Sequence, residues 1–177
     1  MEGQRMQQYE SVRSNQYFQI ELYGSQKSLI LRDNDDYNFF FKILDKFLLD
    51  NKTVDLLAYC LKSNSVHMLL CQSSSGQIDS LIKNICLDYD KYFFNKYKVR
   101  DVLDLGSHVI TKTDACLIMQ ASKDIHLLPD DWLDYPYSSI RAYLYDDTPD
   151  WLDKDHIVDL CGTTENYFNF LCRTVAK

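Results

Sequence analysis

Residues 57–70 constrain the fold of this chain more than any other segment. The sequence LAYCLKSNSVHMLL has two apolar runs of strand length around the polar turn Lys62-Ser63-Asn64, which is the pattern of a β-hairpin. The second run carries His67. Alternate side chains of a strand share one face, so a metal-binding histidine pair on this strand would also need a histidine at position 65. Serine stands there instead, and the hairpin therefore has half of a His-x-His metal strand.

The spacing of apolar residues predicts the order β-α-β-β-α-β-α, followed by shorter helices. Expected strands cover 17–23, 54–61, 66–71 and 102–110. Expected helices cover 37–49 (capped by Asp33 or Asn34), 77–97, 115–127 (capped by Thr113 or Asp114), 138–145, 153–161 and 164–175. This order predicts an α+β fold, in which an antiparallel sheet has helices packed on one face and C-terminal helices are added.

We divide the chain into three parts on the same grounds. Residues 1–14 are expected to be a flexible N-terminus and 15–129 an α+β domain. Residues 130–177 are expected to form an acidic segment and C-terminal helices that pack on that domain.

The composition indicates a globular protein, with 46% hydrophobic and 14% aromatic residues in 177. No apolar run approaches the roughly 18 residues of a membrane helix, and the polar N-terminus is not a signal peptide. A cytoplasmic protein with no membrane partner is expected. The six cysteines form no CxxC pair, which favours reduced, buried thiols over a zinc site.

The net charge of −7 is unevenly distributed. Between Asp124 and Asp159 there are ten acidic residues and only two basic ones, Arg141 and Lys154. This acidity argues against a protein whose whole surface coats nucleic acid, but it leaves room for a local basic face.

Four blocks in the sequence resemble, in order, those of the single-tyrosine HUH transposases, and in particular the REP-associated tyrosine transposases. The blocks are 57–70, 88–97, 124–129 and 134–144, the last reading DYPYSSIRAYL. The resemblance implies a ferredoxin-like or RRM-like sheet, a dimer, and cleavage and rejoining of single-stranded DNA at hairpins. It also implies a metal held by two histidines and a helix residue, with a tyrosine nucleophile on that helix.

Three of the four chemical positions implied by the resemblance are substituted. The histidine pair falls on Ser65 and His67, the tyrosine on Asp124, and the third metal ligand on Leu128. A carboxylate in place of the tyrosine repels the phosphate, and a leucine cannot bind a metal. We therefore expect no enzyme activity, no catalytic residue, no metal and no cofactor, and we interpret the chain as a domesticated family member.

Alternative uses of these residues remain open at this stage. His67 and Asp124 could hold a metal together, although a hydrogen-bonded histidine beside an acid is the simpler interpretation. His126 is expected to point to another face of its helix than Asp124 does. Tyr89 and Tyr92 have the spacing of core residues, and the aspartates after position 129 are expected to form a solvated surface.

A scaffold without its nucleophile can still bind DNA, either as a single-stranded hairpin or as a duplex. The long helix and its exit form a cationic strip with aromatic neighbours, suited to phosphate contacts and base stacking. The residues predicted to bind DNA are Lys83, Lys91, Lys96, Lys98, Arg100, Lys112, Tyr92 and Tyr97.

The sequence thus favours a DNA-binding transcription regulator, nucleoid-associated and expected to be a homodimer. The alternative is a protein-interaction module that uses the acidic segment 130–159 and does not bind DNA. A metal-dependent single-strand nuclease is a distant third.

Overall fold

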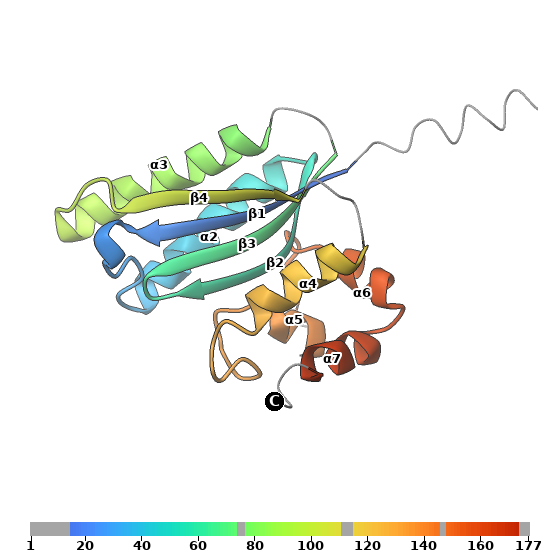
Figure 1. The fold of residues 1–177 in the computed structure, drawn as a ribbon. Helices are drawn as coiled ribbons and strands as arrows, with labels where there is room; N and C mark the ends of the chain where they lie inside the picture. Colours follow the sequence, from blue (N-terminus) through green and yellow to red (C-terminus); the bar gives the residue numbers. More distant parts are fainter. Residues whose placement is uncertain (1–14, 74–76, 111–114, 146–147, 174–177) are drawn as a thin grey trace, which may run out of the picture.

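The computed structural model describes residues 15–73, 77–110, 115–145 and 148–173, so the predictions for 1–14 and for the cap at Thr113 or Asp114 lie outside the described residues. Figure 1 shows a curved four-stranded sheet between two sets of helices. In chain order the elements are β1 (Gln16–Gly24), η1 (Ser25–Lys27), α2 (Asn34–Asp50), β2 (Val54–Lys62), β3 (Ser65–Gln72), α3 (Ile78–Tyr97), β4 (Leu103–Ile110), α4 (Ala115–His126), α5 (Ile140–Tyr145), α6 (Asp155–Cys161) and α7 (Thr164–Cys172).

The sheet has the strand order β2-β3-β1-β4, and every neighbouring pair is antiparallel. The central strand β1 leads through α2 to the outer strand β2, and the central strand β3 leads through α3 to the outer strand β4. This order is the one that the ferredoxin-like expectation requires. The α+β class predicted from apolar spacing is confirmed.

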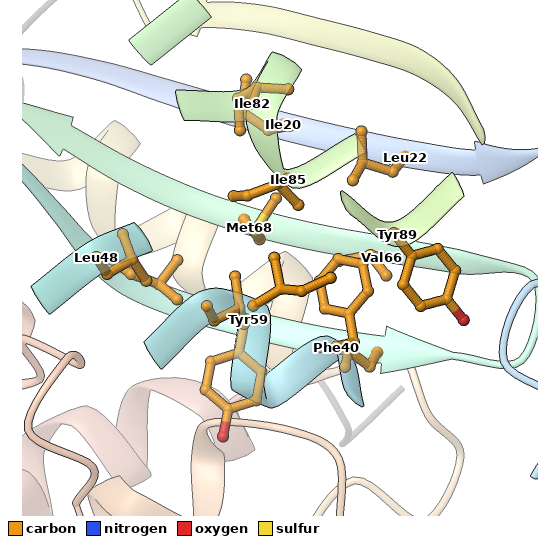
Figure 2. Close-up of a cluster of buried hydrophobic side chains, with 14 of the residues drawn as sticks. Ile20, Leu22, Phe40, Leu48, Tyr59, Val66, Met68, Ile82, Ile85 and Tyr89 are labelled. Atoms are coloured by element: carbon orange, nitrogen blue, oxygen red, sulfur yellow. The ribbon is translucent and has the colours of Figure 1, made fainter. Parts of the chain in front are cut away.

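One face of the sheet packs against α2 and α3. Its core contains the even-numbered residues of β1 and β3, among them Ile20, Leu22 and Met68, together with Phe40 of α2 and Tyr89 of α3. Figure 2 shows these side chains meeting between the strands and the two helices. The prediction that Tyr89 is a core residue holds, because the side chain is fully buried.

The opposite face of the sheet is covered by the helices that follow β4. A second core joins the odd-numbered side chains Leu69 and Cys71 of β3 to Ile118 and Ile125 of α4 and to Tyr167 of α7. Figure 1 shows α4 lying across β2 and β3, with α5, α6 and α7 beyond it. The predicted C-terminal helices thus cover the second face of the sheet.

The acidic segment covers the outer edge of β2 through backbone hydrogen bonds. The amide of Leu61 donates to Tyr137 (2.9 Å), the amide of Ser139 donates to Tyr59 (3.0 Å), and the amide of Asp153 donates to Leu56 (2.9 Å). These bonds satisfy groups that an edge strand would otherwise expose. They tie the segment to β2 along most of the length of that strand.

The predicted elements agree with the observed ones to within a few residues at each end. Asp33 is the cap of α2, and its carboxylate accepts the amides of Asp35 and Asp36, as expected for an N-cap aspartate. Within the described part of the chain, none of the helices combines the length and apolar character needed to cross a membrane.

Candidate functional site

The β2–β3 hairpin places Ser65 and His67 on the sheet face that α4 covers. Lys62 pairs with Ser65 and Cys60 pairs with His67 across the hairpin. Because Leu69, two residues farther along β3, packs against α4, the alternation of the strand puts Ser65 and His67 on the same face. Both side chains are buried.

His67 is enclosed by polar side chains from its own strand and from β1. Its Nε2 lies 3.0 Å from the Ser65 hydroxyl, and its Nδ1 lies 3.5 Å from the carboxylate of Glu21, the residue opposite it on β1. The ring of Tyr23 stands edge-on to the imidazole, and the Tyr23 hydroxyl donates to Glu21. The sequence suggested a hydrogen-bonded histidine beside Asp124. The histidine is hydrogen-bonded, but the acid recorded beside it is Glu21.

The electrostatics of the cluster favour a neutral imidazole. Burial lowers the pKa of His67, and the charge of Glu21 only partly offsets this effect. The hydrogen bond to Glu21 raises the pKa of Tyr23 to about 12. At neutral pH His67 and Tyr23 are therefore both uncharged.

Asp124 and Leu128 stand at the C-terminal end of α4. Asp124 is exposed and accepts a hydrogen bond from Gln120 on the same helix, 2.7 Å away. Leu128 is half-buried against the second core, and its carbonyl oxygen lies 3.4 Å from the ammonium of Lys62. Since Lys62 pairs with Ser65, the structure brings Leu128 to the hairpin end that carries Ser65.

The residues present do not fit a divalent metal by their donor chemistry. Among the described residues, no three histidine, cysteine or acidic side chains converge as a metal site would require. The serine hydroxyl on Nε2 of His67 is a weak ligand, and the leucine side chain has no donor atom. The cluster is suited to hydrogen bonding within the protein.

His126 points away from Asp124, as expected from their spacing of two residues. It is fully buried, with Nδ1 2.8 Å from the Tyr167 hydroxyl and Nε2 2.6 Å from the Ser139 hydroxyl. Burial lowers its pKa to about 3. Sequence reasoning missed this contact, because Tyr167 lies 41 positions away on a helix whose packing no local pattern fixes.

The predicted cationic strip divides into two groups in the structure. Lys83, Lys91, Lys98 and Arg100 are exposed, on α3 and immediately after it. The guanidinium of Arg100 lies 3.9 Å from the centre of the Phe94 ring. Lys91 and Arg100 line one hollow of about 340 Å³ beside that ring. Lys112 lies outside the described residues.

The second group, Lys96, Tyr92 and Tyr97, lies in a cluster that joins α3 to the start of α2. The Lys96 ammonium lies 2.6 Å from Asp33 and 2.8 Å from Asp36. The hydroxyls of Tyr92 and Tyr97 donate to Asp36 at 2.8 and 2.9 Å. Tyr92 also stacks on Phe39, in keeping with the core role expected from its spacing.

The Lys96 cluster holds one cation between two carboxylates. Burial alone raises the pKa of Asp36, but hydrogen bonds from Lys96, from the amide of Arg32 and from the two tyrosines hold it below its usual range. Burial opposes the charged form of Lys96 as well, but its bonds to the two aspartates raise its pKa. These three predicted DNA-binding side chains are thus engaged within the protein.

Solved structures with a similar fold were found by comparison. The structure of a REP-associated tyrosine transposase bound to a REP hairpin matches with a TM-score of 0.56 and 16% identity, over 77% of this chain and 83% of that one. A putative transposase from Deinococcus radiodurans matches with a TM-score of 0.46 and 15% identity, over 66% of this chain and 95% of that one. No family model matches the sequence, and no curated protein matches it.

At 16% identity the likeness concerns the fold. The chain therefore has a fold similar to that of a REP-associated tyrosine transposase.

Proposed function

We propose that this chain is a catalytically inactive, transposase-derived DNA-binding protein that acts as a transcription regulator. The observation that carries the proposal is the environment of His67. Its two ring nitrogens face Ser65 and Glu21, while the positions assigned to the tyrosine and the third ligand hold an exposed aspartate and a half-buried leucine. This arrangement supports a fold kept for binding.

The outer side of α3 supplies the binding surface in this proposal. Lys83 and Lys91 lie eight positions apart on the helix, about 12 Å along its axis at 1.5 Å per residue. Arg100 and Lys98 extend the surface beyond Tyr97, beside the ring of Phe94. Exposed cations next to an aromatic ring suit phosphate contacts and base stacking. The hairpin bound to the structural neighbour supports hairpin DNA as the first ligand to test.

The test combines cleavage and binding of a labelled hairpin with a single-stranded flank. With Mg²⁺ or Mn²⁺ we expect no nicking and no covalent protein–DNA adduct. Binding is expected to weaken steeply with salt. Replacing Lys91 and Arg100 together with alanine is expected to weaken it by about tenfold, on the order of 1 kcal/mol or more.

The matched control is the pair Lys27→Ala and Lys52→Ala, which removes the same charge from two exposed sites off α3. Equal loss of binding in both pairs would show a general charge effect and move the binding surface elsewhere. A metal-dependent covalent adduct would restore the third candidate, a single-strand nuclease. Lys96 is left intact in this design because it holds the α2–α3 cluster together.

The second candidate is an interaction module that does not bind DNA. It is favoured by the exposed aspartates of the acidic segment, namely Asp130, Asp131, Asp134, Asp150, Asp155 and Asp159. Absence of binding to hairpin, single-stranded and duplex DNA at low salt would decide for this candidate. Chromatin crosslinking with enrichment at discrete loci would decide for the regulator. The proposal includes a cytoplasmic, nucleoid-associated homodimer, and light scattering tests the dimer.

A further inference from the structure

A small cavity lined by aromatic rings lies between α2, β2, α5 and the loops that precede α5 and α6. It measures about 280 Å³ and is lined by Phe41, Tyr59, Pro136, Ser138, Arg141, Ala142, Thr148, Pro149 and Trp151. The three rings come from elements far apart in the sequence. The cavity is on the α2 side of the sheet, whereas His67 is on the face that α4 covers, so the two sites are separate.

The three aromatic rings contact one another, Phe41 and Trp151 in a stacked arrangement and Tyr59 edge-on or tilted to them. The rings of Phe41 and Trp151 are 6.2 Å apart at an interplanar angle of 27°. The ring of Tyr59 lies 5.7 Å from Phe41 and 5.5 Å from Trp151. Figure 2 shows Tyr59 at the margin of the α2–α3 core, away from Leu22 and Tyr89. Its ring is mostly covered, while Phe41 and Trp151 are half-buried, so these two present open aromatic surface.

The residues that line the cavity differ in charge from the acidic stretch of sequence that surrounds them. The stretch from Asp124 to Asp159, which includes the acidic segment, has ten acidic and two basic residues. One of those cations, Arg141, lines the cavity, and none of its described lining residues is acidic. Arg141 is exposed, and its guanidinium stands 5.5 Å from the Tyr145 ring. The cavity thus combines aromatic walls with a positive rim.

These features select an aromatic, anionic occupant. A positive rim disfavours a cationic ligand, which excludes the quaternary ammonium groups that aromatic cages otherwise hold. A nucleobase stacks on aromatic walls, and its phosphate pairs with an arginine. The volume lies at or just below the lower end of the roughly 300–1,000 Å³ of small-ligand sites, which suits one base.

We propose that this cavity binds a single unstacked nucleotide, with the base against Phe41 and Trp151 and the phosphate on Arg141. This proposal depends on the proposed function in one respect, namely that the bound nucleotide is part of single-stranded DNA. Ser138 already donates to the Tyr59 carbonyl, and the two prolines have no amide hydrogen. The site is therefore expected to bind any nucleobase and to discriminate little among the four DNA bases.

The fluorescence of Trp151 can report on ligand binding in the cavity that this residue lines. The chain has two tryptophans, so the full chain with Trp132→Phe leaves Trp151 as the single reporter. The probes are the four deoxynucleoside monophosphates, deoxyribose 5-phosphate, a ten-residue oligothymidylate, and the same oligonucleotide with abasic sites. We expect saturable quenching by all four nucleotides within about fivefold of one another. The two base-free probes are expected to bind at least tenfold more weakly.

Variants separate binding from folding. Arg141→Gln is expected to weaken nucleotide binding about tenfold, and Phe41→Leu is expected to weaken it severalfold. Lys52→Gln makes the same charge change at a distant exposed site, and its affinity is expected to stay within twofold of the parent. Thr148→Val is a control in the cavity wall. The Thr148 hydroxyl oxygen is shielded from solvent and finds no hydrogen-bond partner among the described residues, so its removal is expected to leave nucleotide affinity unchanged.

The outcomes distinguish the cavity from the α3 surface. Oligonucleotide binding that falls in Arg141→Gln supports both the cavity and the proposed function. Binding of mononucleotides without binding of the oligonucleotide supports the cavity with a free nucleotide as its ligand and rejects single-stranded DNA as the ligand of the cavity. Oligonucleotide binding that is unchanged in Arg141→Gln and Phe41→Leu, or quenching that is equal with abasic probes, would overturn the cavity proposal.

Discussion

At the scale of single residues, buried histidines make this protein sensitive to acid. His126 has both ring nitrogens within hydrogen-bond distance of hydroxyls, in an environment that lowers its pKa to about 3. The unfolded chain binds a proton at this side chain near its ordinary pKa of about 6.5. Stability from His126 is therefore fully present above pH 6.5 and is lost as pH falls toward 3.

We predict that His126 makes the free energy of unfolding fall by on the order of 1.4 kcal/mol per pH unit once pH drops below about 6. His67, with its pKa also lowered, adds to the slope. Denaturant titrations between pH 7 and 4.5 measure it. The variant His126→Asn is expected to be less stable at pH 7 and to have a flatter profile. An equally steep profile in that variant would place the acid sensitivity in other groups.

His67 also shows what a residue pattern can and cannot predict. Alternation along β3 correctly placed it with Ser65 on one face. The partner on its other side, Glu21, sits 46 positions earlier and becomes a neighbour only through the register of β1 with β3. The sequence of one strand indicates which face of the sheet each side chain occupies. The neighbour of that side chain on the adjacent strand depends on how the two strands pair, and one strand alone does not determine this.

At the scale of elements, α2 and α3 are joined at one end by an ion-pair cluster. The carboxylate of Asp36 has no exposed surface, and Lys96 supplies its cation. Removing that cation leaves a buried charge without its counter-ion, which is costly. Lys91, on the same helix, pairs with Asp88 at 3.4 Å in an exposed setting, where ion pairs contribute little.

We predict that Lys96→Met lowers the free energy of unfolding by about 1–3 kcal/mol, whereas Lys91→Met changes it by less than about 0.5 kcal/mol. Urea titrations of the two variants at neutral pH provide the comparison. Equal, small effects would mean that Asp36 is satisfied without Lys96.

The elements differ in how far the sequence predicts them. Helical spacing located α2 and α3 and correctly named Asp33 as a cap candidate. The same spacing placed Lys96 on a cationic strip, since nothing local marks a lysine whose partners, Asp33 and Asp36, lie about sixty positions earlier. The exposed members Lys83 and Lys91 needed only the helical period. Ion pairs between elements need the tertiary packing.

At the scale of the whole molecule, the C-terminal part is integral to the fold. Helices α4 to α7 share the second core with the sheet, and Leu152 belongs to the first core. The Tyr143 hydroxyl donates to the Leu57 carbonyl, 2.6 Å away, in the interior. The composition at 130–159 indicated an acidic surface, and the backbone pairing with β2 was not predictable from charge.

We predict a single cooperative unfolding transition for the whole chain. Both tryptophans lie in the 130–159 segment, so their fluorescence reports on that part, while far-ultraviolet circular dichroism reports on all of the helices and strands. The two signals are expected to change at the same denaturant concentration, because two shared cores couple the parts. Loss of tryptophan signal at clearly lower denaturant would mean that the C-terminal part unfolds on its own.

The hydrogen bonds from residues 137–153 to β2 also limit how this protein assembles. Main-chain groups along the outside of β2 are already paired within the chain, so the sheet is closed to strand addition on that side. A second molecule, or an extended peptide, that lengthens the sheet has to do so at β4. A homodimer built by continuing the sheet would therefore be a symmetric pairing of two β4 strands, with the acidic segments at its two far ends.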